Sequence, residues 1–127
     1  IRLLKIYGYE DKDKAYSIYK TISLLEEIGD EYRRLSVVYS RLGNKVSRKV
    51  LWCFEGINKL LESYYYLYYD FSKEGLEKFY KNAQDTMHKI KASYENGNNV
   101  DVQSLSSLDT ILHLIKNLSE ENMVVKL

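Results

Sequence analysis

Two acidic residues in a strongly patterned stretch are the first candidates for chemistry. Glu26 and Asp30 lie four residues apart in TISLLEEIGDEYRRL, residues 21–35. On an α-helix this spacing places both carboxylates on one face, one turn apart, where they can approach a common ion. Charged pairs at this spacing are more often solvated surface groups. The pair is therefore a candidate metal site and needs support from the rest of the chain.

A second stretch near the C-terminus offers a comparable pair. Residues 107–125 align without gaps with residues 24–42, and the two candidate acids are then matched by Asp109 and His113. These are again metal-competent side chains at positions i and i+4. Apolar residues also correspond in this alignment, as Leu25 with Leu108, Ile28 with Ile111 and Leu35 with Leu118. A structural histidine whose ring nitrogens are satisfied by hydrogen bonds is the alternative interpretation of His113.

The first acidic pair belongs to a helix that we expect over residues 13–42. A stripe of residues recurs there at steps of three and four, namely Ile18, Ile22, Leu25, Gly29 and Tyr32. Such steps are typical of one face of an α-helix. We expect this stripe to be the buried face, with Glu26 and Asp30 at its border.

The remaining elements are predicted to be three further helices with short connections. No proline occurs in the chain, so long uninterrupted helices are favoured. Glycine and asparagine at Gly43 and Asn44 predict the end of the first helix. The next three helices are predicted to begin near Lys45 or Val46, at Ser72, and at Asp101 or Ser104. The fold class expected is all-α, an antiparallel up-and-down bundle of four long helices.

Apolar residues at alternating steps of four and three predict the buried faces of the last three helices. The tyrosine-rich run 64–69 lies on the first of these, and because no basic residue is close, core and partner packing is favoured over a base-stacking platform. The predicted faces are Val50, Phe54, Ile57, Leu61, Tyr64, Tyr68 and Phe71, widened by Trp52 and Leu60; Leu76, Tyr80, Ala83, Met87, Ile90 and Tyr94; and Leu105, Leu108, Ile111, Leu112, Ile115 and Leu118.

Length, charge and cysteine content narrow the classes of function. The 127 residues suit one domain, and 19 basic against 18 acidic residues give a net charge of +1, which argues against direct contact with nucleic acid. The single Cys53 cannot form an internal disulfide, so we expect a reducing, cytoplasmic setting. No apolar run predicts a membrane span or a signal peptide. The chain begins at Ile1, so we expect it to be part of a longer polypeptide.

The stretch LLEEIGDEYRRLSVVYS resembles the signature of the PhoU family. In that family the third helix of each three-helix repeat reads approximately L-E-R-I-G/A-D-H-A-x-x-I-A, and its E-x-x-x-D carboxylates can hold metal clusters. Leu25, Glu26, Ile28, Gly29 and Asp30 match this pattern. The resemblance implies that Glu26 and Asp30 are metal ligands, joined by Asp109 and His113 in the second copy. Carboxylate with imidazole suits Fe, Mn or Zn.

The resemblance also implies a layout and a role. Residues 1–44 would be the end of a first repeat, with the tail of its second helix and its third helix. Residues 45–127 would be a second three-helix repeat, and both would form one compact domain. PhoU-like proteins regulate phosphate uptake and phosphate signalling, which implies a non-enzymatic role through a transporter, a signalling protein or a second copy. Archaeal relatives often carry an AbrB-type DNA-binding domain linked to transcription regulation, which here would lie outside these residues.

The alternative is a generic helical-bundle interaction or adaptor module without a metal site. Its acids would be solvated, and the aromatic stripe 64–71 would form a dimer interface. A PhoU-like organisation predicts that helix 13–42 carries an apolar face that is exposed or covered by another subunit. A self-contained bundle predicts instead that every apolar stripe is covered within one chain.

Overall fold

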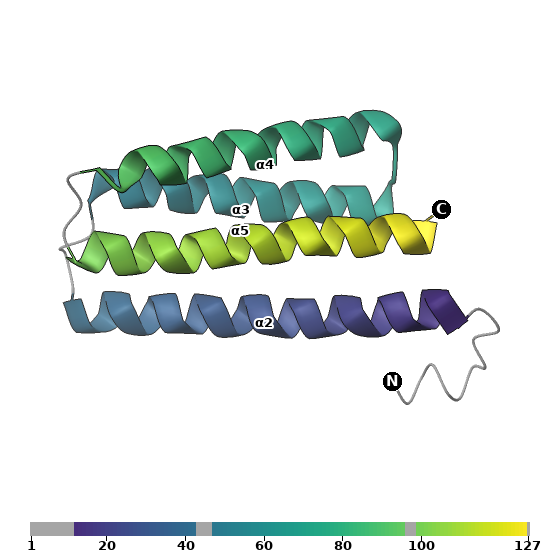
Figure 1. The fold of residues 1–127 in the computed structure, drawn as a ribbon, viewed down its shortest axis with the longest axis horizontal. Helices are drawn as coiled ribbons and strands as arrows, with labels where there is room; N and C mark the ends of the chain where they lie inside the picture. The colour runs from purple at the N-terminus through teal and green to yellow at the C-terminus, as the bar shows by residue number, and fades with distance from the viewer. Residues whose placement is uncertain (1–11, 43–46, 96–98, 127) are drawn as a thin grey trace.

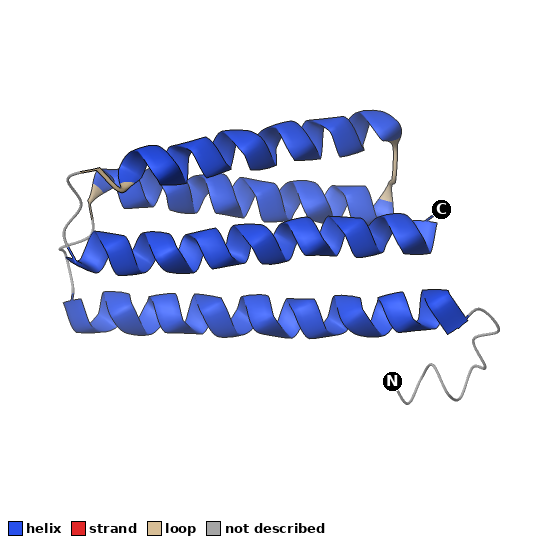
Figure 2. Ribbon diagram, in the orientation of Figure 1, coloured by secondary structure: helices blue, strands red, loops and turns tan. Residues whose placement is uncertain are grey.

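The computed structural model describes residues 12–42, 47–95 and 99–126, which form four helices and no strand (Figures 1 and 2). The helices are α2 (Lys12–Leu42), α3 (Arg48–Tyr69), α4 (Lys73–Ser93) and α5 (Asn99–Lys126). Successive helices run in opposite directions, so the predicted all-α antiparallel bundle of four long helices is confirmed. None of the helices in the described ranges combines the length and the apolar character needed to cross a membrane.

Two serine caps define the first turns of α3 and α4. Ser72 was predicted to open a helix, and its hydroxyl accepts a hydrogen bond from the Gly75 amide at 2.9 Å. The predicted start of α3 at Lys45 or Val46 was too early, because Ser47 is the cap and accepts from the Val50 amide at 3.4 Å.

The start of α5 also differs from the prediction, because the helix begins at Asn99. Asp101 and Ser104, the two residues predicted to open it, both lie inside the helix and are buried. The predicted helix end at Gly43 and Asn44 lies outside the described residues.

Helix α5 lies at the centre of the bundle and packs against all three other helices. In Figure 1 it runs between α2 on one side and the α3 and α4 pair on the other. Its six predicted core residues are all fully buried, namely Leu105, Leu108, Ile111, Leu112, Ile115 and Leu118. Leu114, Ser119 and Asn122 are buried as well, because neighbours on several sides cover more than one stripe of the helix.

Helices α3 and α4 approach each other closely at a glycine. Gly56 is buried on α3, and a Cβ atom added there would lie 3.2 Å from both Cγ2 and Oγ1 of Thr86 on α4. The Thr86 hydroxyl donates to the Asn82 carbonyl at 2.8 Å, which fixes its rotamer. This contact sets the spacing of the two helices.

The predicted buried faces of α3 and α4 were only partly right. On α3 the structure buries Val50, Ile57 and Tyr64 as predicted, but Tyr68 and Trp52 are exposed. Cys53, Gly56 and Leu67 are buried in addition. On α4 the prediction was correct for Ala83 and Ile90, which are buried, and wrong for Tyr80 and Tyr94, which are exposed. The other buried residues of α4 are Phe79, Thr86 and Ser93. Both helices pack mainly against two neighbours, and the buried arc therefore lies between two contact directions.

The predicted buried stripe of α2 was wrong. Ile22 and Leu25 are 43% and 45% exposed, and the buried apolar residues are Leu24, Ile28 and Leu35. The physical reason is that α2 packs mainly on α5, so its core face is the one turned toward α5. The predicted stripe lies beside that face, on the side of α2 that is turned toward α3.

Candidate functional site

The first pair of predicted metal ligands lies on the surface of α2. Glu26 and Asp30 are both exposed, and the Asp30 carboxylate lies 3.8 Å from the guanidinium of Arg33. The neighbouring Glu31 is buried to 9% exposure and forms an ion pair with Arg34. Asp30 and Glu31 therefore already have cationic neighbours one turn along the helix.

The second predicted pair is formed as a local contact on α5. Asp109 Oδ1 lies 3.6 Å from His113 Nε2, and the two side chains are 42% and 57% exposed. The helical spacing thus brings these two residues together as the sequence predicted. With these exposed fractions, the two side chains form a pair on the protein surface.

The described residues do not assemble a complete metal site from these two pairs. Within residues 12–42, 47–95 and 99–126, no three His, Cys, Asp or Glu side chains are grouped closely enough to hold an ion. Each pair alone supplies two ligands, whereas a structural zinc site uses four. The predicted Fe, Mn or Zn site stays a prediction, and the four residues by themselves do not fit a closed coordination shell.

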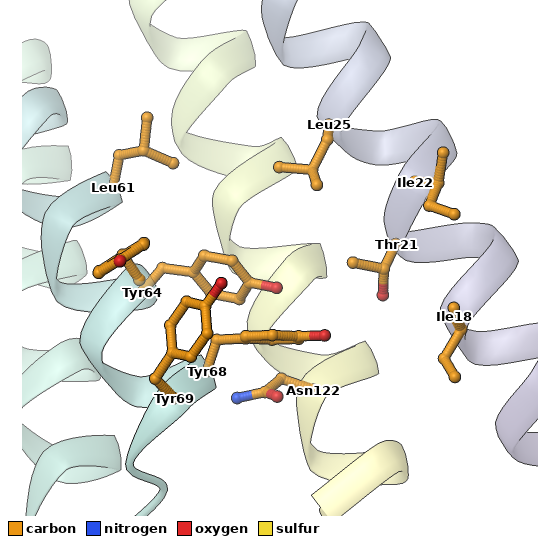
Figure 3. A pocket seen from close by; sticks show the side chains of 10 residues that line it. Ile18, Thr21, Ile22, Leu25, Leu61, Tyr64, Tyr68, Tyr69 and Asn122 are labelled. Carbon is orange, nitrogen blue, oxygen red and sulfur yellow. The ribbon is translucent and has the colours of Figure 1, made fainter.

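A groove lies between α2 and α3. It has a volume of about 460 Å³. We call it the α2–α3 groove, and its lining residues are Ile18, Thr21, Ile22 and Leu25 from α2, Leu61, Tyr64, Tyr65, Tyr68 and Tyr69 from α3, and Asn122 from α5. Figure 3 shows Leu25 and Thr21 on one wall, tyrosine rings on the other, and α5 between them. The volume lies in the range of ligand and peptide pockets.

Direct contacts between α2 and α3 bound one end of the groove. There the Tyr32 hydroxyl donates to Asn58 Oδ1 at 3.1 Å, and its ring meets Phe54 edge to face at 6.1 Å. Tyr39 contacts the same phenylalanine at 6.5 Å. Beyond Tyr32, toward the N-terminal end of α2, these contacts give way to the groove.

The α3 wall of the groove is an ordered cluster of tyrosines. Tyr65 and Tyr69 lie with ring centroids 4.8 Å apart, and Tyr68 meets Tyr69 edge to face at 5.2 Å. Tyr64 contacts Tyr68 at 6.3 Å. Tilted and edge-to-face pairs at these distances are favourable for aromatic rings. The wall is therefore arranged before anything binds to it.

Burial keeps the hydroxyl of Tyr64 in this wall uncharged. Tyr64 is only 6% exposed, and burial, followed by the nearby Tyr68, raises the pKa of its hydroxyl to about 12. A phenol with this pKa is neutral at physiological pH. The groove thus offers rings and aliphatic side chains to a partner, with hydroxyl groups as its polar elements.

Asn122 forms the floor of the groove. It is 1% exposed and its amide donates to the Leu67 carbonyl at 3.5 Å. Its Oδ1 atom is buried without a hydrogen-bond partner among the described residues. Close to this floor, Lys20 and Glu121 form an ion pair of 3.2 Å that ties α2 to α5.

The residues that line this groove stood out in the sequence, but their pattern was interpreted as core or partner packing. The stripe through Ile18, Ile22 and Leu25 was predicted to be core, and the run 64–69 was predicted to pack in the core or against a partner. The structure places parts of both on the two walls of one groove. What spacing along the chain could not show is that α2 packs mainly on α5 and that these two stretches face each other across a groove.

A comparison of the chain with protein-family models, curated proteins and solved structures finds no match.

Proposed function

We propose that this chain is a non-enzymatic interaction module that binds an apolar helical surface of a protein in the α2–α3 groove. One observation carries the proposal, namely an apolar stripe on α2 that the described residues leave partly exposed. Ile22 and Leu25 expose more than two fifths of their surface beside the tyrosine wall. This is the arrangement expected when a covering helix or subunit is missing, and a self-contained bundle would have covered the stripe.

The shape and chemistry of the groove support a helix as the bound element. Its walls are two long helices, and grooves of this kind accept apolar side chains at helical spacing. Tyrosine and leucine are residues that give large contact area at interfaces for a small loss of side-chain freedom. The groove therefore suits a helix that presents an apolar stripe of its own.

Reactive side chains of the described chain are held in unreactive states, which supports a binding role over catalysis. Burial is the main cause that raises the pKa of the Cys53 thiol, so little thiolate forms at neutral pH. The hydroxyl of Ser93 lies 3.3 Å from its sulfur atom, inside the core. The hydroxyl of Tyr64 in the groove stays protonated for the same reason, because burial raises its pKa to about 12.

The narrower hypothesis from the resemblance is a PhoU-like regulatory role in phosphate uptake or signalling. Both hypotheses require a partner that covers the exposed stripe on α2, so this exposure supports the regulatory role as well as the general one. The acids Glu26 and Asp30 would then act as metal ligands that are completed by groups outside the described residues. The two hypotheses share the groove and differ in the identity of the partner.

Photo-crosslinking from the groove tests the interaction proposal. Tyr65, 57% exposed on the groove wall, is replaced by a photoreactive phenylalanine analogue, and the protein is irradiated in its source cells. We expect a defined adduct with a polypeptide. The matched control places the same analogue at Tyr80 on α4, which is 38% exposed and distant from α2. Equal labelling from both positions, or no adduct from Tyr65, would contradict the proposal.

A further inference from the structure

The α2–α3 groove is self-complementary, and this points to its occupant. The groove requires a helix with an apolar stripe, and α2 carries such a stripe through Ile18, Ile22 and Leu25 on its own rim. Resting on the function proposed above, we propose that a second copy of this chain is the bound partner. In a two-fold dimer, α2 of each copy enters the groove of the other.

The spacing of the two walls fits this arrangement. Across a two-fold axis perpendicular to α2, the partner's α2 runs antiparallel to α2 and therefore parallel to α3. The α2 stripe steps by four and then three residues, and the α3 wall repeats these steps at Leu61, Tyr65 and Tyr68. Two parallel helices with equal steps keep their side chains in contact along the interface.

The ends of the stripe allow the two α2 helices to approach closely. Ala15 and Gly29 lie at equal distances on either side of Ile22, so a two-fold axis near Ile22 brings each alanine opposite the partner's glycine. Gly29 is exposed, and a Cβ atom added there would meet nothing within 4 Å in the single chain. Small residues at such positions let helix backbones come close.

The exposed apolar area is in the range that a dimer requires. Tyr19, Tyr65, Tyr68 and Tyr69 are 42%, 57%, 37% and 70% exposed. With roughly 200 Å² for a fully exposed aromatic side chain, these four rings alone present about 400 Å². Ile22 and Leu25 add to this, and a typical stable interface buries about 800 Å² on each partner. The net charge of +1 means that two copies meet without strong repulsion.

The first test is the oligomeric state of the protein and of two matched variants. Sedimentation or light scattering of the purified chain should give twice the mass of 15.0 kDa. Leu25→Glu places a charge on the groove wall and should weaken dimerisation by about 100-fold or more, because each dimer contains two copies of the change. Val37→Glu, on the same helix and equally exposed at 44%, should leave the dimer intact. Circular dichroism confirms that both variants stay helical.

A cysteine at the proposed axis tests the register. Ile22→Cys should give a covalent dimer with a short thiol crosslinker, because each residue 22 lies opposite its counterpart. Val37→Cys is the control, since it lies about 22 Å further along α2 and its two copies would be about 45 Å apart. The native Cys53 is fully buried and should not react in the folded protein.

The mass measurement and the crosslinking experiment each decide whether a second copy occupies the groove. A monomer at all concentrations, a dimer that Leu25→Glu does not weaken, or equal crosslinking at positions 22 and 37 would overturn the proposal. The broader function can survive these results, because photo-crosslinking at Tyr65 would then yield an adduct with a different protein. If that adduct is also absent, the groove is not an interaction site.

Discussion

Gly56 provides a sharp test of the helix spacing, because adding one methyl group there has two opposed effects. Gly56→Ala raises the helix propensity of α3 by about 1 kcal/mol. The new Cβ atom would also lie 3.2 Å from two atoms of Thr86, which is tighter than ordinary contact. Thr86 cannot turn away cheaply, because it is β-branched, 3% exposed and hydrogen-bonded to the Asn82 carbonyl.

The clash should outweigh the gain in propensity. Overpacking of a tight core contact costs about 1–3 kcal/mol. We therefore expect Gly56→Ala to lower the free energy of unfolding by about 1 kcal/mol, the difference between a cost near 2 kcal/mol and the propensity gain. Gly29→Ala is the matched control when it is made in the Leu25→Glu background, where the proposed dimer contact is weakened, because it lies inside α2 and its Cβ atom would meet nothing within 4 Å among the described residues. It should stabilise the protein by about 0.5–1 kcal/mol.

A double-mutant cycle isolates the contact. Thr86→Ala removes both atoms at 3.2 Å and leaves Cβ at 3.7 Å, an ordinary distance. In that background Gly56→Ala should become stabilising by about 1 kcal/mol, so the coupling free energy is about 2 kcal/mol. Urea unfolding followed by circular dichroism measures all four proteins. The reasoning fails if Gly56→Ala stabilises the wild-type protein as much as Gly29→Ala does, or if the coupling is absent.

Three further predictions concern the cap of α4, a groove tyrosine and the acidic pair. Ser72→Ala should lower stability by about 1 kcal/mol in urea unfolding, because the Gly75 amide loses its hydrogen bond, while Ser72→Gly should cost only a few tenths. Tyr64 stays neutral in the folded state up to about pH 12 but ionises near pH 10 when unfolded. Its contribution to the free energy of unfolding is therefore intact below about pH 10. Above about pH 10 that contribution falls by about 1.4 kcal/mol per pH unit up to about pH 12. Tyr64→Phe should flatten this loss, and an unchanged alkaline profile would contradict the burial argument. If the PhoU resemblance holds, purified protein carries Fe, Mn or Zn that Glu26→Ala/Asp30→Ala loses, and metal-free protein would leave both acids as surface charges.

The fold class followed from local signals. The absence of proline, the cap at Ser72 and the apolar spacing of the last helix predicted the observed bundle. The prediction for α5 was accurate because this helix is covered by neighbours on several sides, so nearly any apolar position on it is buried.

The buried face of α2 could not be predicted from spacing alone. This helix carries two apolar stripes side by side, one through Leu24 and Ile28 and one through Ile22 and Leu25. Both have helical periodicity, and only the position of α5 decides which one enters the core. The internal alignment shows the same limit, since Leu108 is buried while its counterpart Leu25 is exposed.

The candidate sites were predictable to different degrees. The contact between Asp109 and His113 is set by helix geometry, so a spacing of four residues was enough to predict it. Whether pairs on different helices converge depends on how those helices are rotated and placed, which the local pattern does not contain. The groove arises from the way α2, α3 and α5 are placed relative to one another, and this too is a property of the assembled bundle.

The attachment of α2 to the bundle has a consequence for how the molecule opens. Its described residues contribute three buried apolar side chains, Leu24, Ile28 and Leu35, and its main neighbour is α5. Opening of α2 as one unit would break its contact with α5, while the contacts among α3, α4 and α5 remain. Anything bound in the groove holds α2 against α3 and therefore suppresses this opening by thermodynamic linkage. Occupancy of the groove and the local stability of α2 are thus two measures of the same equilibrium.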